Sequence, residues 1–129
     1  MIVLDTHVWL WWVAEPERLS KAALSAIDGV ERFGVATISC WEIAMLVECG
    51  RIELDRPVDQ WVDQALASSR VELLSLTGTV AVRAALLGRE GFVGDPADRL
   101  IYATARNAGR WLVTRDKALR AFDPRNTIW

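Results

Sequence analysis

The chain has 129 residues, 52% hydrophobic content and a formal net charge of −2. A chain of this length is expected to form one domain, residues 1–129, with a sizeable core, and a composition this apolar excludes a disordered chain. The near-neutral charge excludes a general polyanion binder, so any contact with nucleic acid has to come from a local patch.

The chain begins with an apolar strand, Ile2–Thr6, around which the other elements are expected to assemble. Three branched apolar residues in a row leave no position for solvent, which is typical of the middle strand of a parallel sheet. Asp5 stands at the carboxyl end of this strand. Ligands bind just outside such strand ends in open α/β sheets, so Asp5 is predicted to mark a site.

Strands and helices then alternate along the rest of the chain, with boundaries predicted from Pro, Gly and capping residues. Further strands are predicted over residues 33–38, 71–76 and 111–114, with a fifth edge strand at 126–129. Helices are predicted over residues 8–14, 19–27, 39–49, 57–69, 80–87, 95–108 and 116–121. This alternation predicts a three-layer α/β/α domain with a central, mainly parallel sheet of four to five strands.

The N-terminus does not read as a signal peptide, because it has no positively charged region and Asp5 and His7 interrupt its apolar run. No stretch is long and apolar enough to span a bilayer. Cys40 and Cys49 are the only cysteines. On a helix over 39–49 they would lie on opposite faces with Cα atoms roughly 13 Å apart, too far for a disulfide. We therefore expect a cytoplasmic protein.

Four acidic residues fall near the carboxyl edge of the predicted sheet. Asp5 follows the first strand, Glu42 the second and Asp116 the fourth, and Asp98 lies at the start of a helix. Gathered carboxylates raise one another's pKa, and a divalent cation is their natural neutraliser. An all-oxygen set favours Mg²⁺ or Mn²⁺ over zinc.

Helix capping is a competing explanation for two of these acids. Ser39 and Glu42 fit a capping box, and Asp95 with Pro96 and Asp98 has the same form, with Asp95 as cap. Helical phase favours a site instead. Both Glu42 and Asp98 stand above the apolar face of their helix, where an acid that only meets solvent would not be placed.

Four short motifs occur in a specific order over nearly the full length. They are Leu4-Asp5-Thr6-His7, Ser39-Cys-Trp-Glu42-Ile-Ala with Gly50-Arg51, Gly94-Asp95-Pro-Ala-Asp98-Arg99-Leu-Ile, and Val113-Thr114-Arg115-Asp116. Each motif alone is common, but the ordered set is specific. The chain resembles the PIN-domain family, and within it the VapC-type toxins of bacterial toxin–antitoxin pairs.

The resemblance implies a metal-dependent endoribonuclease that hydrolyses RNA. It implies homodimers and a cognate, VapB-like antitoxin that blocks the site, and the expected cofactor is Mg²⁺ or Mn²⁺. By position, the catalytic and metal-binding quartet would be Asp5, Glu42, Asp98 and Asp116. The accessory residues would be Asp95, Thr114 and Arg99.

Other residues invite a functional interpretation with less support. His7 is expected to be a packed or capping residue rather than a catalyst, and Trp9 and Trp12 are expected in the core or a dimer contact rather than stacking on bases. Five arginines could contact phosphates or simply form solvated ion pairs, and Arg99 is the first choice because it adjoins Asp98. The five are Arg51, Arg99, Arg106, Arg110 and Arg115.

Three other classes of protein remain as alternatives. A Mg²⁺-dependent phosphatase of the haloacid dehalogenase type needs a second Asp where His7 stands. A phosphoacceptor receiver domain needs a Lys after a separate strand, whereas Lys117 directly follows Asp116. A non-catalytic PIN-like binding module would have lost some of the acids, yet all four are present.

Overall fold

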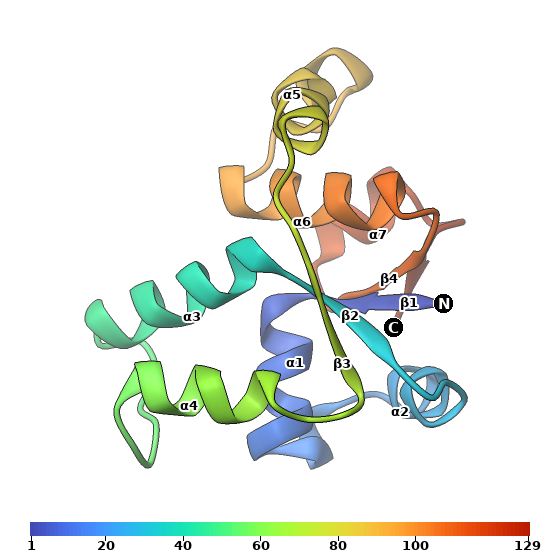
Figure 1. Ribbon diagram of the computed structural model, residues 1–129. Coiled ribbons are helices and arrows are strands. Elements are labelled where there is room, and N and C mark those ends of the chain that lie inside the picture. The colour runs from blue at the N-terminus through green and yellow to red at the C-terminus, as the bar shows by residue number, and fades with distance from the viewer.

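The computed structural model describes residues 1–129, and a five-stranded parallel sheet forms its centre (Figure 1). The central strand β1 (Ile2–Leu4) pairs with strands on both sides and is buried throughout, as its sequence predicts. The strand order is β3-β2-β1-β4-β5. The other strands are β2 (Phe33–Ala36), β3 (Val71–Leu74), β4 (Trp111–Val113) and β5 (Thr127–Ile128).

Helices cover both faces of this sheet, so the predicted three-layer α/β/α architecture is confirmed. The helices are α1 (Thr6–Ala14), α2 (Lys21–Asp28), α3 (Thr37–Glu48), α4 (Val58–Leu66), α5 (Gly78–Leu86), α6 (Pro96–Asn107) and α7 (Lys117–Phe122). Two 3₁₀ turns, η1 (Pro16–Arg18) and η2 (Leu87–Glu90), complete the elements. No helix combines the length and the apolar character needed to cross a membrane.

The alternation of side chains along β1 builds two separate cores. Ile2 and Leu4 pack on one face with Trp9 of α1, whereas Val3 packs on the other face with Ile101 of α6. A strand that is apolar on both faces is stable only between two layers of helices. The predicted core position of Trp9 is confirmed, since it is fully buried, and Trp12 packs edge-on against Phe33 in the same core.

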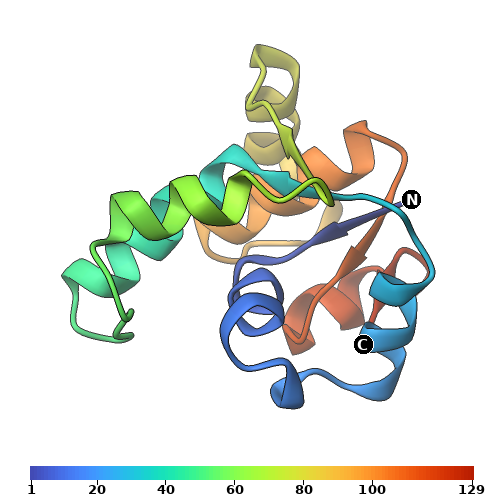
Figure 2. The ribbon, with the colours of Figure 1, turned by 60° about the horizontal axis from the view of Figure 1, so that its bottom comes forward.

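The helices beyond the second strand are arranged unevenly around the sheet. In both ribbon views α3 and α4 lie side by side and extend away from it, while α5 packs outside α6 (Figures 1 and 2). Leu4 is level with Val35 of β2 and Val113 of β4. The residues that follow these strands therefore emerge at the same edge of the sheet.

The prediction that Ser39 caps a helix is wrong. Helix α3 begins at Thr37, directly after β2, and has no side-chain cap. This start places Ser39 on the buried face, where its hydroxyl oxygen accepts a hydrogen bond of 3.0 Å from the Thr6 hydroxyl. Glu42 consequently lies in the second turn of α3 rather than in its first.

The remaining boundaries differ from prediction by a few residues. The first strand ends at Leu4 rather than Thr6, because Asp5 already caps α1. The cap predicted at Asp95 is confirmed, since its side chain accepts a hydrogen bond from the backbone N–H of Ala97. Ser20 caps α2 in a similar way and accepts a hydrogen bond from the Ala23 N–H. Both cysteines are free, one of them on α3 and the other just after it.

Candidate active site

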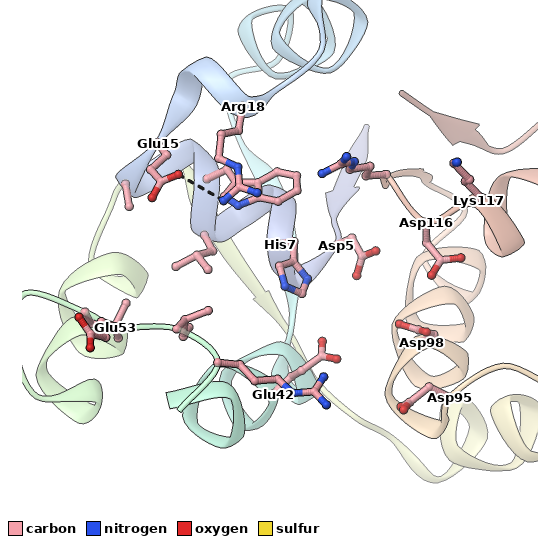
Figure 3. A pocket seen from close by; sticks show the side chains of 17 residues that line it. Asp5, His7, Glu15, Arg18, Glu42, Glu53, Asp95, Asp98, Asp116 and Lys117 are labelled. Atoms are coloured by element: carbon pink, nitrogen blue, oxygen red, sulfur yellow. Dashed lines mark hydrogen bonds and ion pairs between the residues drawn. The ribbon is translucent and has the colours of Figure 1, made fainter. Parts of the chain in front are cut away.

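A pocket of about 810 Å³ opens at the carboxyl edge of the sheet. Its polar lining is almost entirely charged. The acids are Asp5, Glu15, Glu42, Glu53, Asp95, Asp98 and Asp116. The basic side chains are His7, Arg18, Arg51, Arg115 and Lys117. Figure 3 shows Asp95, Asp98 and Asp116 along one side, Glu42 across from them, and Asp5 and His7 between.

Asp5 is the buried centre of this pocket, with a side chain held at both oxygens. Its Oδ1 accepts a hydrogen bond of 2.8 Å from the Thr6 backbone N–H at the start of α1, and its Oδ2 accepts one of 2.5 Å from the Thr114 hydroxyl. Burial raises the pKa of Asp5, and these two hydrogen bonds oppose the rise. The carboxylate is therefore fixed in place by groups from two neighbouring strand ends.

Thr114 links Asp5 to a second acid. The residue is fully buried after β4, and its hydroxyl oxygen also accepts a hydrogen bond of 3.0 Å from the Asp116 backbone N–H. Asp116 in turn caps α7, since its Oδ1 accepts a hydrogen bond of 2.9 Å from the Leu119 N–H. The second oxygen of Asp116 makes no hydrogen bond and is available to the pocket.

Glu42 approaches from α3, on the other side of Asp5. Its side chain is partly buried, and this burial raises its pKa. The negative charges of Asp5 and Asp95 raise that pKa further, while Thr6 and His7 oppose the rise. Glu42 thus shares an electrostatic environment with the acids that cap α1 and α6.

The pKa of Asp98 shows most directly that several acids lie close together. Its pKa is raised to about 7, by burial first and then by the charges of other carboxylates. These carboxylates belong to Asp5, Asp116, Glu42 and Asp95. The largest influences on this pKa all raise it, so negative charge predominates around Asp98.

Comparison with known proteins identifies the family of this chain. Residues 2–123 match the family model of the PIN domain. The chain belongs to the PIN-domain family. It is 47% identical over 130 residues to the protein named ribonuclease VapC22 of Mycobacterium tuberculosis, an alignment that covers 99% of this chain and 98% of that protein. This PIN domain is thus a homologue of the VapC ribonucleases, as its motifs predict.

Solved structures share the fold at low sequence identity. A toxin–antitoxin complex from Klebsiella pneumoniae matches with a TM-score of 0.71 and 18% identity, covering 100% of this chain and 97% of that chain. VapBC2 from Rickettsia felis, bound to a DNA fragment from its promoter, matches with a TM-score of 0.68 and 15% identity, covering 98% and 97%. At these identities the likeness establishes the fold of this PIN domain and nothing further.

The acids of this PIN domain fit a hard cation in donor type but do not enclose one tightly. No group of three or more His, Cys, Asp or Glu side chains is close enough together to hold a metal ion directly. Mg²⁺ commonly keeps several water ligands and uses only one or two carboxylates of the protein. The spacing here therefore fits a hydrated cation among oxygen donors rather than a closed, fully chelated site.

Two of the sequence predictions place residues differently from the structure. His7 is neither buried nor a cap: it is exposed, lines the pocket, and its ring lies 5.7 Å from that of Trp11. The reason is its place in the first turn of α1, where its side chain faces the open pocket, whereas residues 8–11 that follow it are buried. Arg99 does not line the pocket, although it adjoins Asp98, because neighbouring positions of a helix point in different directions.

Other residues reach the pocket without a clear sequence signal. Arg18 comes from η1, a short turn that the sequence predicts only as the end of a helix at Pro16. Trp11 is 6% exposed and also lines the pocket. Of the five arginines considered for phosphate contacts, Arg51 and Arg115 line the pocket and the other three do not. Arg110 is instead paired with Glu72 at 2.9 Å.

Proposed function

We propose that this PIN domain is a metal-dependent endoribonuclease toxin that hydrolyses RNA phosphodiester bonds in the acidic pocket. The single observation that carries the proposal is the gathering of acids around the partly buried Asp98, where burial first and then the charges of these acids raise the pKa of its carboxyl group to about 7. The support from relatives is the 47% identity to a protein named as a ribonuclease. We also propose that residues 1–129 function as one domain.

Within this proposal the four predicted acids share the work of holding Mg²⁺ or Mn²⁺. Asp5, Asp98 and Asp116 would be ligands, directly or through water, and Glu42 would be a ligand or the base that orients the attacking water. When bound, the cation supplies an acidified water and neutralises charge on the phosphate. Thr114 acts as a positioning residue, because its hydroxyl fixes the carboxylate of Asp5. Asp95 adds negative charge from the cap of α6.

Water is the proposed nucleophile rather than the 2′-OH of the RNA. An attack by the 2′-OH needs one group that removes its proton and another that protonates the leaving oxygen, and the chain has a single His, His7, rather than a pair of histidines for these roles. The carboxylates instead line one pocket, where a hydrated cation would supply the attacking water for hydrolysis of the bond.

The proposed partner is a small VapB-like antitoxin, with the toxin itself a homodimer. The support is that the similar solved structures include a toxin–antitoxin complex, VapBC2, and VapBC-1 from nontypeable Haemophilus influenzae. An antitoxin that presents an Arg to the pocket would neutralise its excess of carboxylates. Since RNA is the proposed substrate, we propose that the protein acts in the cytoplasm.

The direct test is to map the RNA ends that the purified protein produces. With Mg²⁺ or Mn²⁺, the native chain should generate new ends that are absent with Asp98→Ala. Asp63→Ala is the matched control, because Asp63 is an exposed acid on α4 away from the pocket, and it should cleave like the native chain. Identical end profiles for the native chain and Asp98→Ala would refute the proposal.

Thermal unfolding tests the metal separately from cleavage. A cation that binds only the folded state stabilises it by about 2.7 kcal/mol at a concentration of 100 times Kd, so Mg²⁺ and Mn²⁺ should raise the Tm by several degrees. Asp5→Asn should abolish that rise while Asp63→Asn retains it. A native protein whose Tm does not respond to either ion would contradict the metal site and favour a non-catalytic binding module. The ion that acts at the lower concentration is the better candidate for the cofactor.

A further inference from the structure

Most of the basic side chains of the pocket are not paired with its acids. The structure has three ion pairs, Arg18 with Glu15, Arg56 with Asp55 and Arg110 with Glu72. Arg51, Arg115 and Lys117 therefore line the pocket without an ion-pair partner, although seven acids line it too. Basic side chains that are not paired with nearby carboxylates are available to bind another anion.

Two of the arginines are held by an aromatic ring. The guanidinium carbon of Arg18 lies 4.4 Å from the ring centroid of Trp11, and that of Arg115 lies 5.6 Å from it. Arg18 comes from η1 and Arg115 from the segment between β4 and α7, so two distant parts of the chain meet on one side chain. Trp11 is itself fixed in the core and packs against Trp129.

Stacking on Trp11 prepares the two arginines for a ligand. A cation–π contact uses the flat face of the guanidinium, so the N–H donors in its plane stay available for hydrogen bonds. Both side chains are exposed, and contact with a fixed ring restricts their guanidinium groups, so less conformational entropy is lost when a ligand binds. The fork of N–H donors matches the oxygens of a phosphate.

The charge and size of the pocket favour a nucleic acid strand as the ligand. Its volume of about 810 Å³ is well above what one hydrated cation and one phosphate require, and it lies in the roughly 300–1,000 Å³ range of pockets that take drug-sized ligands. A strand carries a phosphate at every nucleotide. It can therefore place one phosphate at the acids, bridged by a cation, and a neighbouring one at the arginines.

We propose that Arg115 and Arg18, supported by Trp11, bind a phosphate of the RNA strand next to the one that is cleaved. This inference rests on the proposed ribonuclease function, because it uses the same pocket and substrate. Trp11 then supports phosphate-binding side chains rather than stacking on a base. A phosphate contact positions the strand but does not read its sequence, so the subsite acts on all RNA sequences alike.

The binding test uses Asp98→Asn as the parent protein, so that RNA stays intact in the presence of Mg²⁺. Fluorescence anisotropy of a labelled single-stranded oligoribonucleotide is measured over a range of salt concentrations. Adding Arg115→Gln should weaken binding about tenfold and reduce the slope of log K against log salt by about 0.7, the value for one phosphate contact. Adding Arg115→Lys keeps the charge but loses the fork and the stacking, and should weaken binding about threefold.

Arg125→Gln is the matched control in the same parent. Arg125 is an exposed arginine just before β5, at the edge where strands begin, and so it lies away from the pocket. Its replacement should leave affinity within about twofold and the salt slope unchanged. Thermal unfolding of each variant establishes that it is folded. Equal affinities and slopes for Arg115→Gln and Arg125→Gln would overturn the inference.

Cleavage kinetics separate this inference from the proposed function. With Asp98 intact, Arg115→Gln should raise KM about tenfold and leave kcat within about twofold, whereas a replacement that displaced Asp116 would lower kcat. Cleavage with an unchanged KM in Arg115→Gln would overturn the inference and leave the ribonuclease proposal standing. A native chain that cleaves no RNA, in a series where Arg115 still governs RNA binding, would overturn the ribonuclease proposal and the placement of this phosphate beside a cleaved one, and would leave the phosphate contact of Arg115 standing. A parent that binds no RNA, or that binds an acidic peptide through Arg115 instead, would overturn the inference.

Discussion

The two sides of the pocket treat charge in opposite ways. On the acidic side, burial and then the charges of neighbouring carboxylates raise the pKa of Asp98 to about 7. On the other side, Arg18 and Arg115 rest on the ring of Trp11. Opposite charges in one pocket could neutralise each other, but here they are largely kept apart. The separation leaves the acids available to a cation and the arginines available to an anion.

On each side of the pocket, uncharged groups hold the charged side chains in place. Asp5 is fixed by the Thr6 backbone and the Thr114 hydroxyl, while the arginines are fixed by Trp11. The acidic arrangement is unfavourable in the absence of a ligand, because like charges repel and burial removes their hydration. Residues whose arrangement lowers the stability of the folded state in this way are typical of functional sites.

The largest effect on the acidic side of the pocket is expected from removing the hydroxyl group of Thr114, which holds the carboxylate of Asp5. Thr114→Val keeps the shape of the side chain but removes the donor to a buried carboxylate and the acceptor for the Asp116 N–H. The free energy of unfolding should fall by about 1–3 kcal/mol, the usual cost of unsatisfied buried polar groups. RNA cleavage should fall by roughly 10- to 100-fold, as for residues that orient metal ligands.

Thr114→Ser is the control for this prediction, because it keeps the hydroxyl and removes only a methyl group. Its cleavage rate should stay much closer to that of the native chain, even though the lost packing lowers its stability. Urea unfolding and initial cleavage rates provide both measurements. If Thr114→Val cleaves RNA as fast as Thr114→Ser, the hydroxyl does not position Asp5.

The fold could be predicted from the sequence because the residues that determine its strands and helices are close together along the chain. The unbroken apolar run Ile2–Leu4 predicts a strand covered on both faces, and Pro96 and Asp95 predict the start of α6; both are confirmed. The first residue of α3 could not be predicted in this way. Ser39 fits a cap by sequence, but its hydroxyl is used by Thr6, which is 33 residues away along the chain.

The acidic side of the pocket was also more predictable than the side around Trp11. Asp5 and Asp116 lie just after strands and Asp98 lies in the first turn of a helix, positions that a sequence reveals. Together with Glu42, all four predicted acids line one pocket. Their roles as ligands or catalysts stay predictions. Arg18 belongs to a short turn and meets Arg115 only through Trp11, so no spacing along the chain brings them together.

A smaller effect is expected from the pH dependence of the metal-free protein. The folded state retains the Asp98 proton up to a pH of about 7, whereas an unfolded chain releases it near pH 4. The folded state therefore binds more protons between these values, and the free energy of unfolding falls as the pH rises through this window. Asp98→Asn removes this loss and should be more stable than the native chain at pH 8 by roughly 1–2 kcal/mol, after allowance for solvent screening.

Urea unfolding in EDTA at pH 5 and pH 8 measures this difference. Asp63→Asn should follow the native chain at both values, since Asp63 is exposed and outside the pocket. The prediction fails if Asp98→Asn loses as much stability as the native chain between the two pH values. In that case the repulsion around Asp98 would not be a cost to the fold.

The smallest effect tests which group holds Arg18. Its guanidinium is paired with Glu15 at 3.3 Å, but both side chains are about half exposed, and such pairs contribute little stability. Glu15→Gln should therefore change the free energy of unfolding by less than about 0.5 kcal/mol. It should also raise RNA affinity slightly, by less than about threefold, because Arg18 stays on Trp11 while the pocket loses one negative charge. A fall in affinity, measured by the same anisotropy titration, would mean that Glu15 rather than Trp11 keeps Arg18 in place, and the two sides of the pocket would then not be independent.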